Sequence, residues 1–278
     1  MTEEPSPLLI GGTGWIGQAV LDRLPNARCI RARDLLRSPG LDLLRAAIGG
    51  DPAPVIVNLA TVKTGPWEEM DAVNHLLVEE LARFASACGG HLVQAGSAAE
   101  YGLTPGAEWV SAETPYRPKS DYGTTKLAGS MSALKYGDGI VLRPLNVYDS
   151  PPQLGSPLAD IRERILTGLK NHTDIEVLSA GTMRDYVTRE FVASSIEWAV
   201  RNPDTGGAFS VSSGYPVGVG EIAEAAIKLA GSDVGVADLQ MFPPTTIAAD
   251  PAPWGDVSGL WESNSAIDIA TALVGKTD

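Results

Sequence analysis

The chain has 278 residues, of which 44% are hydrophobic and 20% are charged, and its formal net charge is -13 at pH 7. This length and composition are typical of a folded protein with one large domain, or with a domain and a smaller lobe. The negative charge argues against a nucleic-acid partner, because phosphate backbones bind to positive surfaces, whereas a small anion can still bind in a locally basic cleft.

The sequence also predicts a cytoplasmic protein that does not bind membranes. No window approaches the ~18 to 20 consecutive apolar residues of a membrane span. The N-terminus, MTEEPSPLLI, is acidic and lacks a long apolar stretch, so no signal peptide is expected. Cys29 and Cys88 have apolar neighbours and no metal-ligand spacing, so we expect free thiols, a reducing compartment and no metal.

Short apolar runs alternate with helical patterns in the first half of the chain. We expect buried strands at 8–10, 27–30, 55–60, 91–96 and 140–145. Helical spacing predicts helices at 15–24 and 70–88, the second with an apolar face made of Leu77, Leu81, Phe84, Ala85 and Cys88. This alternation predicts an α/β fold, a Rossmann doubly wound parallel sheet with helices on both faces.

The pattern changes after residue 149, at the Pro/Gly/Ser-rich stretch YDSPPQLGSP. A helix is expected after Ser156 as N-cap and Pro157, followed by short strands in EVLSAG and AFSVSSG and a helix in VGEIAEAAIKLAG. We therefore predict a dinucleotide-binding domain at 1–149 and a smaller α/β substrate lobe at 150–278, interleaved with the sheet near 175–215. The tail at 242–278 shows no interpretable pattern.

The stretch LLIGGTGWIGQAVLDRL places Gly11, Gly14 and Gly17 between the first strand and the first helix. Glycines let the backbone turn tightly and approach a phosphate, and the helix directs its free N–H groups at that phosphate. The sequence therefore predicts a dinucleotide site. Its expected contacts are Gly11, Thr13, Gly14, Trp15, Ile16 and Gly17.

The end of the second strand should select the dinucleotide. An acidic side chain there accepts hydrogen bonds from a free ribose, whereas a basic one accommodates a 2′-phosphate. Arg31 and Arg33 stand at this place and favour NADP(H). Asp34 follows directly and leaves NAD(H) open as the alternative.

Ser97 follows the strand at 91–96 in GSAAEYG, and Tyr122 and Lys126 are four residues apart in SDYGTTK. Ligands of open α/β sheets bind outside the carboxyl ends of the strands, where Ser97 is expected. A Tyr-x-x-x-Lys pair alone is weak evidence, since many chains contain it by chance. Its position after Ser97 and the glycine loop makes Tyr122 a candidate proton donor.

These stretches, together with VIVNLA, VNHLL, LRPLNVY, GTMRDYV and FSVSSGYPVGVGEIAEAA, occur in an order that resembles the extended short-chain dehydrogenase/reductase family. The similarity is to its nucleotide-sugar epimerase, dehydratase and reductase branch. It extends from residue 8 to about residue 230, and the tail matches poorly.

The resemblance implies roles that also make physical sense. Tyr122 would protonate the developing alkoxide, Lys126 would favour the phenolate and hold the nicotinamide ribose, and Ser97 would hydrogen-bond the substrate oxygen. Further expected cofactor contacts are Asn58, Leu59, Ala60, Asn74 and Pro144. Asn74 resembles the polar position that backs this site in relatives, and a helix residue bonded to nearby backbone is its alternative. The expected substrate contacts are Ala98, Glu100, Asn146 and Arg184, the last as the guanidinium that binds a nucleotide diphosphate.

Ala98 and Ala99 stand where dehydratases of this branch carry an Asp-Glu pair, which argues against dehydration. Glu100 makes the stretch similar to that of nucleotide-sugar 4-ketoreductases, although a solvated loop carboxylate is the alternative. The resemblance therefore implies an NAD(P)H-dependent reductase of an NDP-4-keto-6-deoxyhexose, in deoxysugar or antibiotic biosynthesis, that acts as a homodimer. The alternatives are an NAD-dependent sugar epimerase and, from another class, a dinucleotide-binding sensor.

Some positions depart from the family pattern. Asp149 replaces a usual glycine, and Thr188, Arg189 and Glu190 occur where an acidic pair is usual. A non-sugar natural-product ketone is therefore a further alternative substrate. Trp254 and Trp261 could line a pocket for such a ketone, although packing in the core or at the surface is the simpler expectation.

Overall fold

The structure, a computed structural model, describes residues 6–37, 42–102, 107–111, 113–137 and 139–275. Within these residues, six parallel strands form the central sheet in the order β10-β6-β4-β3-β1-β2. They are β1 (Leu8–Ile10), β2 (Arg28–Ile30), β3 (Val55–Asn58), β4 (His91–Ala95), β6 (Ile140–Pro144) and β10 (Gly207–Val211). Each expected strand of the first half is present, and the predicted Rossmann α/β class is confirmed.

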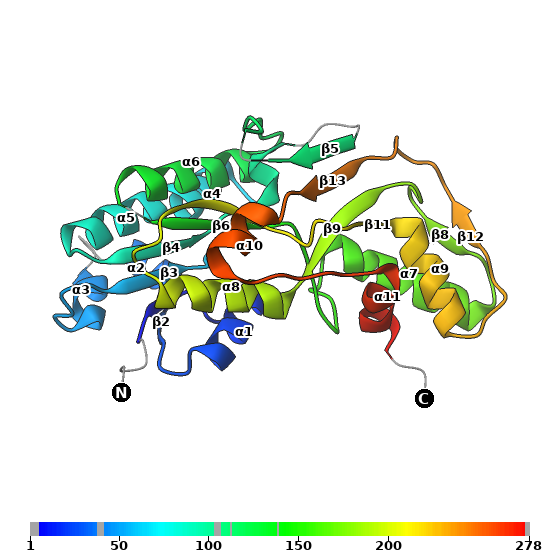
Figure 1. Ribbon diagram of the computed structural model, residues 1–278, viewed down its shortest axis with the longest axis horizontal. Helices are drawn as coiled ribbons and strands as arrows, with labels where there is room; N and C mark the ends of the chain where they lie inside the picture. The colour runs from blue at the N-terminus through cyan, green and yellow to red at the C-terminus, as the bar shows by residue number, and fades with distance from the viewer. Residues whose placement is uncertain (1–5, 38–41, 103–106, 112, 138, 276–278) are drawn as a thin grey trace.

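Helices cover both faces of this sheet (Figure 1). One face carries α2 (Ala32–Leu36), α3 (Asp42–Ile48), α5 (Leu77–Ala87) and α6 (Asp121–Lys135). The other carries α1 (Trp15–Arg23) and α8 (Arg189–Arg201). Successive side chains of a strand point to opposite faces, so Leu8 and Ile10 join the first core while Leu9 joins the second. Burial on both faces explains why these strands are continuous apolar runs.

The helix predicted at 70–88 begins earlier and is interrupted. It consists of α4 (Trp67–Asp71), a π-helical segment (Ala72–Leu76) and α5, which end to end form one rod. The fully buried Asn74 lies in the π segment, and its carbonyl oxygen would be 2.0 Å from a Cβ on Gly129 of α6. Helix α6 therefore packs directly on the backbone of the π segment. Such segments often occur at functional sites.

The second lobe contains most of the chain after residue 149, to the right in Figure 1. Its helices are α7 (Pro157–Asn171), α9 (Val219–Leu229) and α11 (Ala266–Val274), which share one apolar core. Ser156 caps α7 ahead of Pro157, as expected, through its side-chain oxygen, which accepts from the Ala159 N–H. The strands are β8 (Ile175–Val177), β9 (Met183–Thr188), β11 (Pro216–Gly218), β12 (Val236–Asp238) and β13 (Thr246–Ala249).

The two lobes exchange strands. Strand β5 (Ala107–Val110), from the first half of the chain, joins the β11-β9-β13-β5 sheet of the second lobe. Strand β10 returns from the second half to the edge of the central sheet, and the short β7 (Asn146–Tyr148) connects the lobes by pairing with β9.

The tail after residue 242, which has no interpretable sequence pattern, contributes to both lobes. Helix α10 (Ala252–Ser258) inserts Trp254, which is 1% exposed, into the core under α8, and α11 packs on α9 in the second lobe. The Trp254 indole N–H donates to the Ser195 hydroxyl at 3.1 Å, and its ring packs edge-on against Trp198 with centroids 5.3 Å apart. Trp254 is therefore a core residue.

Replacing Trp254 by alanine should lower the free energy of unfolding by about 3–5 kcal/mol, because it removes the largest buried side chain of this core and leaves a cavity. Urea denaturation followed by circular dichroism measures the change. Trp109→Ala is the control, since Trp109 is 53% exposed and should cost less than about 1 kcal/mol. Equal losses in the two variants would contradict the assignment of Trp254 to the core.

Candidate active site

The glycine loop after β1 leaves no room for side chains. Gly11 has a φ of 87°, and a Cβ there would lie 2.8 Å from the Ala60 backbone nitrogen. A Cβ on Gly17 would lie 2.4 Å from the Gly11 carbonyl oxygen. Gly14 caps α1 without a side-chain hydrogen bond, so the N–H groups of the first helical turn remain available to a ligand. The loop and helix start therefore fit the pyrophosphate of a dinucleotide.

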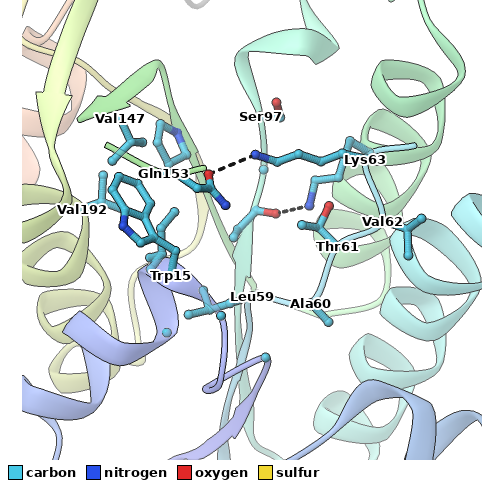
Figure 2. A pocket seen from close by; sticks show the side chains of 18 of the residues that line it. Trp15, Leu59, Ala60, Thr61, Val62, Lys63, Ser97, Val147, Gln153 and Val192 are labelled. Carbon is cyan, nitrogen blue, oxygen red and sulfur yellow. Dashed lines mark hydrogen bonds between the residues drawn. The ribbon is translucent and has the colours of Figure 1, made fainter. Parts of the chain in front are cut away.

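A cavity of about 1240 Å³ extends from this loop to the second lobe. The predicted site residues that line it are Gly11, Thr13, Gly14, Trp15, Ile16, Gly17, Arg31, Arg33, Leu59, Ala60, Ser97, Tyr122, Lys126, Pro144, Asn146 and Arg184. Figure 2 shows Trp15 and Thr61 on opposite sides of it, with Leu59 between them. The volume is large enough for a cofactor and a second ligand.

The end of β2 presents two arginines to the cavity. Arg31 Nε lies 2.7 Å from one Asp34 carboxylate oxygen, and Arg33 Nε lies 3.9 Å from the other. Both arginines line the cavity, whereas Asp34 is absent from its lining. The Asp34 carboxylate is thus paired with the arginines, both of which line the space that a ligand would fill.

Ser97, Tyr122 and Lys126 meet at the carboxyl end of β4. Ser120 caps α6 by accepting from the Gly123 N–H at 3.1 Å, which places Tyr122 in the first turn. The side chains of Ser97 and Thr61 lie close enough to the Tyr122 hydroxyl to favour its ionised form. Lys126 lies one turn further on, and its ammonium donates to the Ala95 carbonyl at 2.5 Å.

Burial shifts the pKa of both titratable groups in this cluster. It raises the pKa of Tyr122, and the hydrogen bonds with Ser97 and Thr61 partly oppose that rise. It lowers the pKa of Lys126 to about 8, with the Glu100 carboxylate opposing the shift and Arg143 adding to it. The lysine therefore titrates close to neutral pH, while the phenol keeps its proton.

Four predicted contacts do not line the cavity: Asn58, Asn74, Ala98 and Glu100. Asn58 is buried between strands and donates to Gln94 at 2.9 Å. Asn74 binds the Val62 backbone N–H and carbonyl and donates to Thr125 at 3.1 Å, so it holds the loop after β3 against α6. These two residues support the cavity wall from behind.

The expectation that Glu100 contacts the substrate is wrong, and so is the alternative of a solvated carboxylate. Its side chain is 0% exposed and its Oε2 accepts from Arg143 Nε at 2.6 Å. The other oxygen accepts from the Ser97 N–H and from the Ser130 hydroxyl. Ala98 turns to an apolar cluster with Val110 and Leu145, which explains its absence from the cavity.

The second lobe supplies the far end of the cavity. Arg184 lines it, donates to the Met183 and Thr245 carbonyls at 2.8 and 2.9 Å, and has a pKa lowered by burial. Asn146 lines it while donating to the Asp185 carbonyl. Asp185 itself is buried and accepts from Ser213 and Gly214.

Thr61 and Lys63 are among the lining residues that the sequence analysis did not name. Thr61 lies near Tyr122, and Lys63 reaches across the cavity to Gln153, with 3.3 Å between Nζ and Oε1 (Figure 2). Thr61 directly follows the predicted stretch from Asn58 to Ala60, and Lys63 is two residues further on. A prediction that continued past Ala60 into the loop would have included both residues.

The departures from the family pattern also find an explanation. Asp149 forms an ion pair with Arg189 at 2.7 Å, and the Arg189 guanidinium lies 5.4 Å from the centre of the Trp15 ring. Thr188 caps α8, the role for which a short polar residue suffices. Trp254 and the 56% exposed Trp261 do not line the cavity, which removes the argument for an aromatic pocket.

Within the described ranges, no group of three or more His, Cys, Asp or Glu residues is placed to hold a metal ion. No helix in that part of the chain is long and apolar enough to cross a bilayer.

Known proteins with similar sequences and structures were compared with the chain. It is 26% identical over 276 residues to the dTDP-6-deoxy-L-talose 4-dehydrogenase (NAD(P)(+)) of Kitasatospora kifunensis, covering 89% of this chain and 82% of that protein. Many solved structures share the fold, among them the following two. Bordetella bronchiseptica WbmG, in complex with NAD and UDP, has a TM-score of 0.77 at 21% identity, covering 99% of this chain and 95% of that one. RMD from Pseudomonas aeruginosa, complexed with NADPH, has a TM-score of 0.79 at 19% identity, covering 99% and 98%.

The family model described as the NAD dependent epimerase/dehydratase family matches residues 8–212, from the first strand to the last strand of the central sheet. This match confirms the resemblance on which the sequence analysis relied. The chain belongs to the NAD dependent epimerase/dehydratase family.

Proposed function

We propose that the protein is an NADP(H)-dependent ketoreductase that reduces the 4-keto group of a nucleotide-linked 4-keto-6-deoxyhexose. The observation that carries the proposal is that Ser97, Tyr122 and Lys126 line the same cavity as the glycine loop. In this assignment residues 1–149 bind the cofactor and residues 150–278 bind the substrate, apart from the exchanged strands.

The bound nicotinamide would supply the hydride to the carbonyl carbon. Tyr122 donates its proton to the carbonyl oxygen as negative charge develops there. The Ser97 hydroxyl donates a hydrogen bond to the same oxygen and positions it. The Lys126 ammonium then stabilises the phenolate that Tyr122 leaves behind, because the two side chains are one helical turn apart.

The substrate class is supported by the relative from Kitasatospora kifunensis, whose name states a 4-dehydrogenase activity on a dTDP-linked 6-deoxysugar. Oxidation at that carbon is the reverse of 4-keto reduction. Arg184 and Lys63 add positive charge to the far half of the cavity, which suits a diphosphate.

NADP(H) is supported by Arg31 and Arg33 at the cavity wall, with Asp34 paired behind them. A 2′-phosphate would face two guanidinium groups there, whereas an NAD site needs a free carboxylate. An NAD-dependent epimerase is the second candidate, because WbmG shares the fold and was solved with NAD.

A homodimer, a cytoplasmic location and a role in antibiotic biosynthesis stay predictions. For the dimer, Leu76 and Met131 are exposed apolar side chains on the neighbouring π segment and α6. Size-exclusion chromatography with light scattering tests it directly.

Incubating the protein with NADPH and dTDP-4-keto-6-deoxyglucose should consume the cofactor in proportion to the sugar, as followed by absorbance. An epimerase would interconvert sugars with no net consumption, and a sensor would bind the cofactor without turnover. Absence of consumption with every nucleotide ketosugar tried would overturn the proposed reductase.

Tyr122→Phe should lower kcat by about 10²- to 10⁴-fold, because it removes the proton donor and leaves the ring. Cofactor affinity, measured by fluorescence titration, should stay unchanged. Tyr215→Phe is the control, since Tyr215 is 59% exposed and lies outside the cavity lining. A Tyr122→Phe variant with the wild-type rate would show that another group donates the proton.

The rate of reduction should fall as the pH is raised above about 8. The Lys126 pKa is lowered to about 8, so the ammonium is present below this pH and is lost as the pH rises through it. Plots of kcat/KM for NADPH against pH should fall by roughly tenfold per unit on that limb. Lys126→Met should be slow with no limb near pH 8, whereas the exposed Lys135→Met should retain it.

Arg33→Ala should weaken NADPH binding by roughly tenfold to a hundredfold and leave NADH binding unchanged, because it removes one charged partner of the 2′-phosphate. Titration of both cofactors into wild type and variant measures the ratio. Arg37→Ala is the matched control, being an exposed arginine on the same segment but outside the cavity. Equal weakening of NADH and NADPH would place Arg33 elsewhere on the cofactor.

A further inference from the structure

Glu100 occupies an unusual place for a carboxylate. It is fully buried, and it accepts hydrogen bonds from three parts of the site: the Ser97 N–H at 2.8 Å, the Ser130 hydroxyl at 2.9 Å and Arg143 Nε at 2.6 Å. These donors belong to the turn after β4, to α6 and to β6, respectively. A charge is buried at this depth only where its partners are fixed.

The partner cation is as deeply buried as the carboxylate. Arg143 is 1% exposed, and its guanidinium lies 4.8 Å from the ring centre of Tyr116 and 5.6 Å from that of Tyr101. The two rings stack on each other with centroids 5.4 Å apart. The ion pair therefore lies between an aromatic pair and the catalytic turn, and neither charge can reach water.

Two of the donors connect Glu100 to the reacting groups. The Ser97 backbone N–H donates to the Glu100 carboxylate, and the Ser97 hydroxyl accepts from the Ala99 N–H at 3.2 Å. These two reciprocal hydrogen bonds fix the turn from Ser97 to Glu100. Ser130 follows Tyr122 and Lys126 at four-residue intervals on α6, so the three side chains share one face of the helix. One carboxylate oxygen thus joins the Ser97 turn to the helical face that carries Tyr122.

We propose that Glu100 is a positioning residue for the carbonyl reaction: by holding the Ser97 backbone and Ser130 on one oxygen, it sets the separation of the Ser97 and Tyr122 hydroxyls. The inference rests on the proposed function. Glu100 itself touches no substrate, because it is excluded from the cavity. It acts through Ser97.

The first test is Glu100→Gln, whose amide cannot accept from both Arg143 and Ser97, since one of its two ends is a donor. We expect kcat to fall by about tenfold to a hundredfold, as for a displaced catalytic group, with the KM for substrate and the affinity for cofactor little changed. In a protein that already carries Ser97→Ala, adding Glu100→Gln should lower kcat hardly any further. Equal, additive losses in the two backgrounds would show that Glu100 does not act through Ser97.

The second test needs no turnover. Amide hydrogen exchange followed by mass spectrometry should accelerate in peptides covering 95–101 of Glu100→Gln, with and without bound NADPH. Unchanged protection there would overturn the proposal even if the protein has no reductase activity. Exchange of residues 95–101 could be faster in Glu100→Gln than in wild type while the wild type consumes no cofactor with any ketosugar. That combination would contradict the proposed function and leave the role of Glu100 in holding the turn intact.

Glu262→Gln is the matched control, because Glu262 likewise accepts from the backbone N–H and hydroxyl of one helix-capping residue, Thr188. It should retain kcat and the exchange of 95–101. If Glu100→Gln does not fold, Ser130→Ala carries both tests, since it removes one donor and leaves the ion pair intact. A Ser130→Ala variant with unchanged kcat and exchange would then refute the inference.

Discussion

The contact of helix α6 with its neighbours is the constraint on which the site depends. A Cβ on Gly129 would lie 2.0 Å from the Asn74 carbonyl oxygen, and one on Gly123 would lie 2.5 Å from the Ala99 carbonyl oxygen. The helix backbone therefore touches the π segment on one side and the turn after Ser97 on the other. Packed interiors transmit such contacts with little give. This double contact fixes Tyr122 and Lys126 relative to Ser97.

The cavity is lined mainly by positively charged side chains, whereas the protein as a whole is negatively charged. The protein as a whole carries a net charge of -13, yet the cavity lining includes Arg31, Arg33, Lys63, Lys126 and Arg184, with Glu69 as the acid among the lining residues. A concave, partly apolar wall concentrates such a field. The overall charge thus repels polyanions while the cleft attracts a small anionic ligand, which reconciles the acidic composition with the nucleotide-linked substrate that we propose.

The sequence was sufficient for the central sheet, the glycine loop and the Ser97–Tyr122–Lys126 cluster, because each depends on local pattern and on short spacings. It was wrong about Asn58 and Glu100 as contacts, whereas Asn74 backs the site through backbone hydrogen bonds, which was one of the two expectations for it. A polar residue inside a motif can face a ligand or support the motif from behind, and only the three-dimensional contacts distinguish these cases. Thr61 and Lys63 were missed because loop residues have no periodicity from which their direction could be inferred.

The tail shows the same limit for packing. Trp254 lies in a stretch without helical or strand pattern, and its burial depends on Trp198 and Phe209 from elements far away in the chain. Similarly, nothing local distinguishes β10 as a strand of the first sheet rather than the second. Long-range partners of this kind are decided by the whole fold.

The position of Trp254 has a consequence for how the protein is made. Synthesis proceeds from the N-terminus, and domains that are complete early generally fold first. Here the lobe that contains the central sheet is not complete early. Its edge strand β10 and its largest buried side chain, Trp254, come from the last third of the chain. On the ribosome, the nascent glycine loop and its sheet would wait, with one flank of their core uncovered, until almost the entire polypeptide has emerged.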